Sequence, residues 1–417
     1  MSAPGCVIVG GGQAAVQTAL SLRQAGFRDP IAILCGEPAA PYQRPPLSKA
    51  YLAGEIDAER LAFRPRELYE KLGVDVREGA IAAAVDRAER RVALEDGTSL
   101  PYDALVLATG ARPRPLGIAG EESERVHRLR TLADAKALRG RLRLGGRLVI
   151  VGGGYIGLEV AAVASKRGVR ATIVEALPRL MSRVTGSEVA AFLTDVHRAN
   201  GVEILTGAQA SGLVREPDGG GVQLALADGR RVVADDVIVA VGVVPNVELA
   251  AACGLACEDG IVVDEHGRTS DPAIFAAGDC TSHPSALLGR RLRLESVHNA
   301  IEQGKAVARA VVGDLSEPYV QAPWFWSDQY DLKLQTVGLW SRADRTVVHG
   351  DPEARSFSVL YLDDDGVVAV DAVNAPREFL LARKLFAEHA SGAIPLDAWF
   401  HALGDASPAA AVNTPAD

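Results

Sequence analysis

LVIVGGGYIG, at Leu148–Gly157, runs from four apolar residues directly into three glycines, and a similar stretch, CVIVGGGQAA, stands at Cys6–Ala15. Each stretch has the pattern of a buried strand, a glycine-rich turn and the start of a helix. The backbone N–H groups at such a helix N-terminus can hold a pyrophosphate. One such turn binds one dinucleotide, so two in one chain predict an α/β fold in which electrons pass between two dinucleotides.

The sequence after the first turn completes a βαβ unit. We expect a helix from Gln13 to about Ala25 and a second strand at 31–34, with Glu37 just beyond it. An acid about 20 or more residues after the glycines is typical of the group that binds the adenosine ribose. Glu37 is therefore predicted to hold the ribose of the first dinucleotide.

The second turn is followed by the same arrangement, with a predicted strand at 171–174 and then Glu175. A carboxylate here accepts from a free 2′-hydroxyl and repels a 2′-phosphate, so we predict NADH rather than NADPH as the donor. Arg179 and Arg183 lie nearby in sequence and weaken that preference.

Bulk properties narrow the class of protein. A chain of 417 residues is too long for one core, so two or three domains are expected. The net charge of −9 argues against a nucleic-acid partner. The apolar N-terminal stretch is broken by glycines, and no apolar run reaches the ~18 residues of a membrane helix, so neither a signal peptide nor a membrane span is expected. Five cysteines without a CxxC pair fit a reducing cytoplasm, and the eight histidines do not cluster, so no metal site is predicted.

Further motifs follow along the chain. Pro41–Lys49 is a rigid, proline-rich loop in which Arg44 and Lys49 bring positive charge toward a diphosphate or a flavin ring. The ending of residues 105–110 is echoed at 237–242, which suggests a duplicated architecture. From about residue 322 the pattern changes to period-2 strands, and the Ala/Pro-rich tail 404–417 is expected to fray.

Several motifs in order make the chain resemble the flavoprotein ferredoxin reductases of bacterial oxygenase systems, of the putidaredoxin reductase and biphenyl dioxygenase reductase type. The segments that carry the resemblance are YQRPPLSKAYL at 42–52, LVLATGARPRP at 105–115, LRTL at 129–132, GGGYIGLEVA at 152–161, AAGDC at 276–280, ESVHNA at 295–300 and PWFWSDQY at 323–330. The resemblance covers residues 7 to about 385. A lone glycine turn is weak evidence, whereas this ordered set is specific.

The resemblance implies a glutathione-reductase-like fold with two Rossmann-like dinucleotide-binding domains and a C-terminal α+β domain. The FAD-binding domain is then discontinuous, at 1–112 and 244–321. The NAD-binding domain is inserted at 113–243, and the C-terminal domain occupies 322–417.

Site residues carried over from the family fall into two sets. The residues expected around FAD are Gly10, Gly12, Ala15, Glu37, Arg44, Pro45, Lys49, Ala82, Thr109, Gly110, Arg130, Asp279, Val297 and Trp326. Those expected around NAD are Gly152, Gly154, Ile156, Gly157, Glu159, Glu175 and Gly242. Ala15 stands where the third glycine of the pattern is usual, a replacement that the pattern tolerates.

The predicted chemistry is hydride transfer from NADH to FAD, which needs no side-chain nucleophile because the cofactor supplies the chemistry. Lys49 is the candidate for positive charge near the reduced flavin, with Glu159 as its ion-pair partner. We expect Glu159 in the first turn of its helix, where the dipole favours an anion. Asp279 is expected at the ribityl chain, and an alternative role as a helix N-cap is compatible with that one.

The resemblance implies that the acceptor is a [2Fe–2S] ferredoxin that supplies a cytochrome P450 or a ring-hydroxylating dioxygenase. Arg290, Arg291 and Arg293 could steer an acidic ferredoxin, or could instead solvate a loop or pair with an FAD phosphate.

Other functions on this scaffold remain as alternatives. A disulfide reductase needs a CxxxxC or CxxC dithiol, and neither spacing occurs in this chain. A peroxidase needs a reactive cysteine in the segment after Glu37, and residues 38–52 contain none. Monodehydroascorbate reduction is harder to exclude. A protein resembling apoptosis-inducing factor, which senses NADH and binds partners, would be expected to carry targeting segments and basic surfaces.

Overall fold

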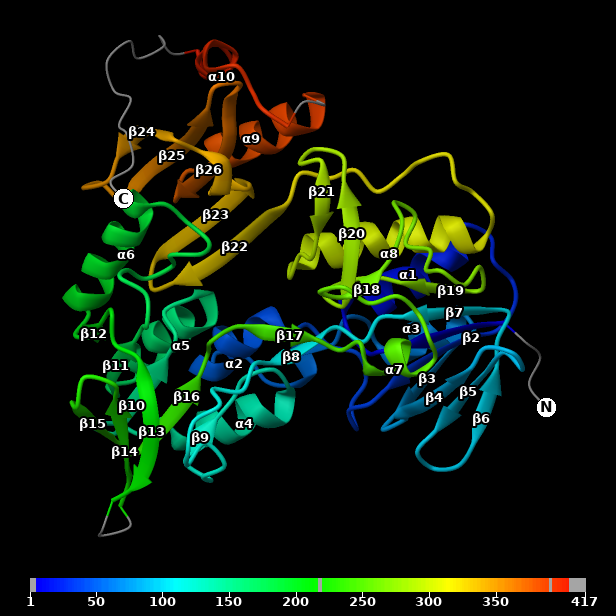
Figure 1. Cartoon of the computed structure of the whole chain (residues 1–417), viewed down its shortest axis with the longest axis horizontal. Coiled ribbons are helices and arrows are strands. Elements are labelled where there is room, and N and C mark those ends of the chain that lie inside the picture. Colours follow the sequence, from blue (N-terminus) through cyan, green and yellow to red (C-terminus); the bar gives the residue numbers. More distant parts are fainter. Residues whose placement is uncertain (1–4, 217–219, 390–391, 405–417) are drawn as a thin grey trace. The chain divides into compact units, whose positions relative to one another are not determined.

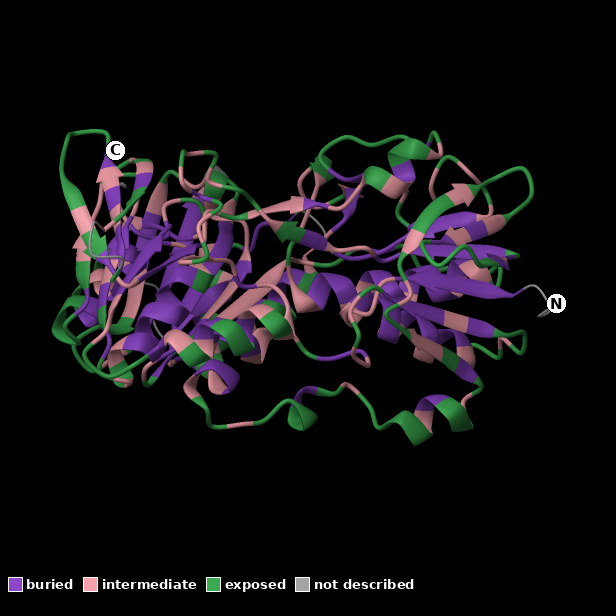
Figure 2. Ribbon diagram, turned by 90° about the horizontal axis from the view of Figure 1, so that it is seen from below, coloured by how far each residue is buried: buried purple, intermediate pink, exposed green. Residues whose placement is uncertain are grey.

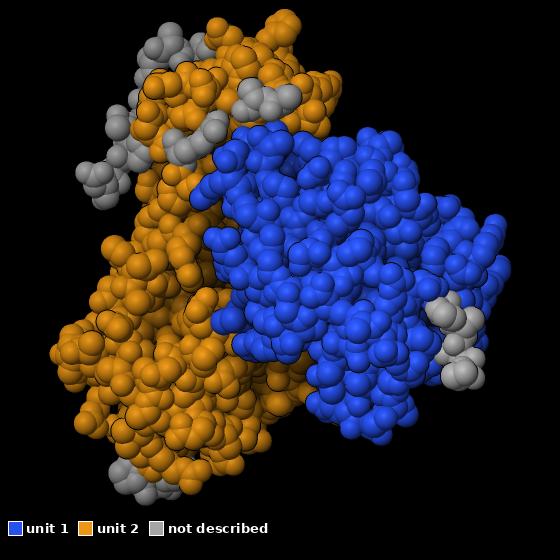
Figure 3. Space-filling model, turned by 45° about the vertical axis from the view of Figure 1, so that its right-hand side comes forward, with its two compact units in different colours: residues 1–44, 59–112, 244–323 blue, residues 45–58, 113–243, 324–417 orange. Residues whose placement is uncertain are grey.

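The computed structural model describes residues 5–216, 220–389 and 392–404, so the predicted frayed tail lies almost wholly outside the described residues. The chain divides into two compact units (Figure 1, Figure 3). Unit 1 comprises residues 1–44, 59–112 and 244–323, and unit 2 comprises residues 45–58, 113–243 and 324–417. The prediction of three domains, defined by their cofactors, stays a prediction, because packing alone gives two units.

Unit 1 is built on a five-stranded parallel sheet with the order β19-β7-β1-β2-β3. Its strands are β1 (Cys6–Val9), β2 (Ile31–Cys35), β3 (Val74–Glu78), β7 (Ala104–Leu107) and β19 (Ile274–Ala276). All residues of β1, β7 and β19 are buried, as expected for a parallel sheet covered on both faces. The predicted βαβ unit is therefore confirmed.

Alternate residues of these strands pack into two separate hydrophobic cores, one on each face of the sheet. On one face Ile8, Ile33 and Val106 pack with α1 (Gln13–Gln24) and α8 (Val297–Val311). On the other face Val7 and Leu105 pack with buried residues of two segments, 92–102 after β3 and 250–263 before β19. Figure 2 shows the buried residues gathered along the strands, with the exposed ones on loops and on parts of the helices.

Smaller elements complete unit 1. They are the antiparallel sheet of β4 (Ala82–Asp86), β5 (Arg91–Leu94) and β6 (Ser99–Pro101), the sheet of β18 (Ile261–Val262), β20 (Thr281–Ser285) and β21 (Arg290–Leu292), and the helices η2 (Glu59–Leu61), α3 (Arg66–Lys71) and α7 (Glu248–Ala252).

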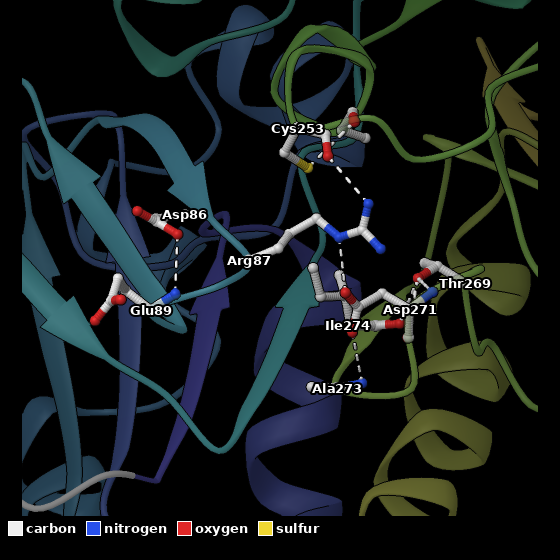
Figure 4. Close-up of polar contacts among 9 residues, drawn as sticks. Asp86, Arg87, Glu89, Cys253, Thr269, Asp271, Ala273 and Ile274 are labelled. Atoms are coloured by element: carbon white, nitrogen blue, oxygen red, sulfur yellow. Dashed lines mark hydrogen bonds and ion pairs between the residues drawn. The ribbon is translucent and has the colours of Figure 1, made fainter.

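Arg87, directly after β4, ties two of these parts together (Figure 4). Its Nε donates to Asp271 Oδ2 at 2.7 Å and its Nη1 donates to the Cys253 carbonyl at 3.3 Å. The Asp271 carboxylate also caps the loop before β19 by accepting from the Ala273 N–H. Arg87 thus connects three parts of unit 1: the β4–β5 hairpin, the end of α7 and the loop before β19.

Unit 2 repeats the parallel sheet, with the order β12-β11-β10-β16-β9. Its strands are β9 (Val126–His127), β10 (Arg147–Val151), β11 (Arg170–Val174), β12 (Glu203–Leu205) and β16 (Asp236–Val239). Beside it lie the antiparallel strands β13 (Ala210–Arg215), β14 (Val222–Leu226) and β15 (Arg231–Ala234), with helices η1 (Pro45–Ser48), α2 (Ala50–Ala53), α4 (Leu132–Arg141), α5 (Tyr155–Lys166) and α6 (Ser187–Ala199).

The C-terminal part of unit 2 is a five-stranded antiparallel sheet with the order β22-β23-β26-β25-β24. Its elements are β22 (Trp324–Gln329), β23 (Leu332–Gly338), η3 (Trp340–Arg342), β24 (Arg345–Asp351), β25 (Ser356–Asp363), β26 (Gly366–Val373), α9 (Pro376–Glu388) and α10 (Leu396–Leu403). The strands predicted beyond residue 322 are confirmed, although β25 and β26 are buried almost continuously and not at every second residue.

The chain crosses between the units close to a two-stranded pairing of β8 (Ala111–Pro113) with β17 (Val243–Pro245). The segment 45–58, which the prediction placed with the FAD domain, packs with unit 2, because α2 contacts α4 and α5.

Candidate functional site

The first glycine turn leaves room for a ligand at its third glycine. Gly10 has φ +128°, and a Cβ there would lie 2.1 Å from the Ala108 carbonyl oxygen, so only glycine fits. A Cβ at Gly11 would come within 2.9 Å of Cys35 Sγ, whereas one at Gly12 would meet nothing within 4 Å. Gly12 caps α1 without a side-chain hydrogen bond, and the first turn of α1 holds no acid. The backbone N–H groups at the start of α1 therefore have no side-chain acceptor at the cap, and they fit a pyrophosphate.

Other predicted FAD residues of unit 1 lie at the same edge of its sheet. Gly10 follows β1, Glu37 follows β2, Thr109 and Gly110 follow β7, and Asp279 follows β19. Carboxyl ends of parallel strands meet at one edge, which is where open α/β sheets bind their ligands. The structure therefore places residues from four separate stretches of sequence along one edge.

Glu37 is held by two of its neighbours in sequence. Its Oε2 accepts from the Tyr42 hydroxyl at 2.5 Å, and its Oε1 accepts from Arg44 Nη2 at 2.7 Å. Arg44, predicted as a flavin-side contact, is thus an ion-pair partner of the predicted ribose acid. Each carboxylate oxygen keeps a second lone pair for a ribose hydroxyl.

The alternative in which Asp279 also caps a helix is wrong. Residues 281–285 form β20, and the next helix, α8, begins at Val297 with Ser296 as its N-cap. The sequence after Asp279 contains Thr281 and Pro284, which fit a strand edge better than a first helical turn. The turn around Asp279 is instead held by Gln303, whose Oε1 accepts from the Gly278 N–H at 2.7 Å and from the Thr281 hydroxyl at 2.9 Å.

The second glycine turn repeats the first. Gly152 has φ +110°, and a Cβ there would lie 2.4 Å from the Ala240 carbonyl oxygen. A Cβ at Gly157 would lie 2.1 Å from the Gly152 carbonyl oxygen, so helix and strand approach as closely as backbone allows. Gly154 is open, with nothing within 4 Å, and caps α5 without a side chain. This turn also fits a pyrophosphate.

Glu175 follows β11 at the carboxyl edge of the second sheet, as predicted. Its Oε2 accepts from the Gly153 N–H at 2.7 Å and its Oε1 accepts from the Leu177 N–H at 2.8 Å. The carboxylate is therefore fixed against the glycine turn, where it can meet a ribose. Gly242, with φ +98°, follows β16 at the same edge, and Ile156 is exposed in the first turn of α5.

Lys49 and Glu159 form the predicted ion pair inside unit 2, with Lys49 Nζ 2.8 Å from Glu159 Oε2. The Glu159 side chain is 3% exposed and the Lys49 side chain 17% exposed. The placement of Glu159 in the first helical turn is wrong, because α5 begins at Tyr155 and Glu159 is its fifth residue. The helix dipole acts mainly within the first turn, so the charge of Glu159 is balanced by Lys49 and not by the dipole.

Two partners of Glu159 were missed from the sequence. The Ser48 hydroxyl donates to Glu159 Oε2, and the Ser327 hydroxyl donates to Oε1 at 2.7 Å. Both serines stand beside predicted residues, Lys49 and Trp326, but a neutral serine carries no sequence signal of its own. Their contact with Glu159 spans 111 and 168 residues of sequence.

The remaining predicted residues are spread over both units. Ala82 opens β4 in unit 1, and Val297 is the first residue of α8 in the same unit. Trp326 lies in β22 of unit 2, with its ring 5.7 Å from that of Trp324. Pro45 opens η1, and Arg130 precedes α4 and its Thr131 cap. With Lys49 and Trp326, four predicted FAD contacts therefore lie in unit 2.

Two of the three arginines that could steer a ferredoxin, Arg291 and Arg293, already have partners within the chain. Arg291 donates to the carbonyls of Val263 and Ser282, and Arg293 pairs with Asp259 and Glu295. Arg290 is exposed on β21. These contacts lie within the chain and test neither the steering role nor its alternatives, which stay predictions.

The cysteines are not poised for thiol chemistry. All five are free. Burial raises the pKa of the Cys6 thiol to about 12, and burial together with the nearby Glu78 and Glu37 carboxylates raises that of Cys35 to about 12. Burial also raises the pKa of Cys280. A thiolate nucleophile needs the opposite shift.

Two glycine cradles, each at the carboxyl edge of its own parallel sheet, define a two-dinucleotide oxidoreductase fold. Residues 4–304 match the family model described as pyridine nucleotide-disulphide oxidoreductase, and residues 324–396 match the one described as reductase C-terminal. The chain belongs to the pyridine nucleotide-disulphide oxidoreductase family.

Individual relatives agree along almost the whole chain. Putidaredoxin reductase CamA of Pseudomonas putida is 44% identical over 386 residues, which cover 92% of this chain and 91% of the relative. Probable ferredoxin reductase CtmF of Castellaniella defragrans is 45% identical over 380 residues, covering 91% and 92%. The crystal structure of the covalent putidaredoxin reductase–putidaredoxin complex superposes with a TM-score of 0.89 at 43% identity, covering 93% of this chain and 94% of that one. The predicted fold class is confirmed.

Proposed function

We propose that this chain is an NADH-dependent, FAD-containing ferredoxin reductase, which passes electrons from NADH through FAD to a [2Fe–2S] ferredoxin. The observation that carries the proposal is the pair of open glycine cradles, Gly12 and Gly154, each followed by a fixed carboxylate. The relatives' names support the acceptor, since they include putidaredoxin reductase and a ferredoxin reductase for the CYP199A2 system.

The residues of unit 1 would hold FAD. The N–H groups at the start of α1 would bind its pyrophosphate, and Glu37, fixed by Tyr42 and Arg44, would accept from its ribose. Asp279 would bind the ribityl chain, with its turn anchored by Gln303.

The start of α5 in unit 2 would hold NADH. Glu175 would accept from the free ribose hydroxyls and would repel the extra phosphate of NADPH. Because one oxygen accepts from the Gly153 N–H of the glycine turn and the other from the Leu177 N–H after β11, the carboxylate cannot swing away from a bound nucleotide without losing both hydrogen bonds. This supports NADH as the donor.

An FAD held by these residues would supply the chemistry, which is acceptance of a hydride and release of single electrons. The chain's own residues orient the nucleotides and place charge. Lys49, held by Glu159 at 2.8 Å, supplies a fixed cation that does not reorganise during the reaction. The aromatic residues of β22, including Trp326 and Phe325, add apolar surface that excludes water.

The acceptor ferredoxin would in turn supply a cytochrome P450 or a ring-hydroxylating dioxygenase. None of the helices in the described ranges is both long and apolar enough to cross a bilayer. We place the protein in the cytoplasm, where its five free thiols would stay reduced.

Steady-state NADH oxidation with and without an added [2Fe–2S] ferredoxin tests the proposal. Addition of the ferredoxin should raise turnover and should reduce the ferredoxin, seen by its visible absorption. Two electrons per NADH should appear as two reduced ferredoxins. NADH oxidation that stays at its basal rate with a panel of such ferredoxins would contradict the proposed acceptor.

A further inference from the structure

A buried chain of hydrogen bonds leads away from Glu159, and the proposed function does not use it. The Ser327 hydroxyl, on β22, donates to Glu159 Oε1 at 2.7 Å. Gln329 Nε2 donates to Ser327 Oγ at 3.1 Å, and Gln329 Oε1 lies 2.9 Å from His197 Nε2 on α6. All four side chains belong to residues that are at most 3% exposed. The chain of hydrogen bonds therefore links three elements of unit 2 through side chains alone.

The carboxylate at one end fixes the direction of every bond. The ionised Glu159, paired with Lys49, only accepts, so Ser327 must use its one proton on it. The Gln329 amide must then donate to Ser327 and turn its oxygen toward His197. That oxygen needs an N–H, so the His197 proton must sit on Nε2.

The outer end of the chain agrees with this direction. Burial lowers the pKa of His197, so the imidazole is neutral and carries one N–H. Its Nδ1 is then an acceptor, and the Tyr330 hydroxyl lies 3.2 Å away. Four donors in a row thus point toward Glu159, an arrangement in which each hydrogen bond polarises the next.

We propose that Ser327, Gln329 and His197 are positioning residues, which hold the Glu159 carboxylate against Lys49 for hydride transfer to the flavin. The proposal rests on the proposed function, and it adds to the Lys49–Glu159 pair the chain that orients it. Lys49 and Ser48 both meet Oε2, so Ser327 is the donor that the structure gives to Oε1. Removing the Ser327 hydroxyl would free the carboxylate to rotate and would leave a buried oxygen without that donor.

The chain positions charge rather than conducting protons. A primary amide passes a proton only by changing its tautomer, which makes Gln329 a poor link in a proton wire. It is a good link in an oriented chain, because its two ends are fixed as donor and acceptor.

The first test is stopped-flow reduction of the FAD-loaded protein by NADH, without oxygen. Ser327→Ala should lower the limiting rate of flavin reduction by about tenfold, the effect expected from losing one hydrogen bond to a charged group, with NADH affinity unchanged. Ser327→Thr, which keeps the hydroxyl, should recover most of the rate. Ser358→Ala is the matched control, because Ser358 is a fully buried serine on β25 of the same sheet whose hydroxyl contacts no polar partner within the described part of the chain.

The second test does not depend on activity. In protein labelled with ¹⁵N-histidine, the ring of His197, assigned with His197→Gln, should show the Nε2–H tautomer, and its resonances should shift in Ser327→Ala and in Gln329→Met. An Nδ1–H tautomer would overturn the proposal, as would His197 resonances that do not move in either variant. Gln329→Met also keeps the test open if Ser327→Ala does not fold.

The two tests separate this proposal from the proposed function. If NADH does not reduce the flavin of the parent protein, the proposed function fails, while the tautomer of His197 still decides whether the chain exists. If the parent is reduced and Ser327→Ala matches its limiting rate, the positioning role is refuted and the proposed function stands.

Discussion

Gly154→Ala and Gly12→Ala together test whether each glycine turn holds its own nucleotide. A Cβ at either position would meet nothing within 4 Å, and neither residue needs a left-handed backbone, with φ −88° at Gly154 and −95° at Gly12. Alanine therefore fits the protein itself, although both positions are helix N-caps, where alanine is less favourable than glycine. The added methyl would occupy space that a pyrophosphate needs when it lies on the backbone.

The expected loss follows from that single methyl. Forcing one carbon into a close-packed contact costs about 1–3 kcal/mol, which corresponds to a roughly 5- to 150-fold weaker binding. Gly154→Ala should raise the dissociation constant of NADH by that factor and leave the FAD content unchanged. Gly12→Ala should lower the FAD content and leave an intact fold.

Isothermal titration calorimetry with NAD⁺ or NADH measures the nucleotide affinity, and the flavin absorption per chain measures the FAD content. Gly140→Ala is the control, because Gly140 in α4 is equally open but lies in no glycine turn. Its NADH affinity should equal that of the parent. Unchanged NADH affinity in Gly154→Ala would refute the assignment of the second turn, and a full FAD complement in Gly12→Ala would refute that of the first.

Three further predictions concern specificity and stability. Glu175→Gln should shift the ratio of kcat/KM for NADH over NADPH toward NADPH by about tenfold or more, because the repulsion of the 2′-phosphate is lost; equal use of both cofactors by the parent would contradict the role of Glu175. Burial raises the pKa of Asp371 to about 7, so between about pH 4 and pH 7 the folded state binds more protons than the unfolded state, and the free energy of unfolding should fall as pH rises. Asp371→Asn should flatten that fall in denaturant titrations across the same range, and an identical slope in both proteins would count against it. Arg23→Ala should lower the free energy of unfolding of unit 1 by about 1–2 kcal/mol, since its guanidinium donates four hydrogen bonds to the carbonyls of Leu72, Phe27, Asp29 and Gly73; a shift within about ±0.3 kcal/mol by denaturant titration would be too small for that role.

Much of the fold could be predicted because its signals are local. Four apolar residues followed by three glycines specify a strand, a turn and a helix within a dozen positions, and both units follow that pattern. Glu37 and Glu175 were placed at sheet edges for the same reason, since an acid just after a buried strand has only one edge on which to lie.

The errors and omissions arose where local sequence does not decide the structure. Glu159 was placed one helical turn too early because the glycine run gave no sign of where α5 begins. Aspartate is a residue type that is common at helix N-caps, but the residues after Asp279 form the strand β20. The contacts of Ser48 and Ser327 with Glu159 depend on tertiary packing between distant segments, and a serine beside a conspicuous lysine or tryptophan gives no hint of that role.

The most direct measurement of the central claim is a titration of the flavin-loaded protein with NADH in the absence of oxygen. About one equivalent of NADH per chain should bleach the flavin absorption, because each cradle holds one nucleotide and the hydride passes between them. A flavin band that persists after excess NADH would show that the two nucleotides do not exchange a hydride, and the proposed route of electrons from NADH to FAD would be wrong.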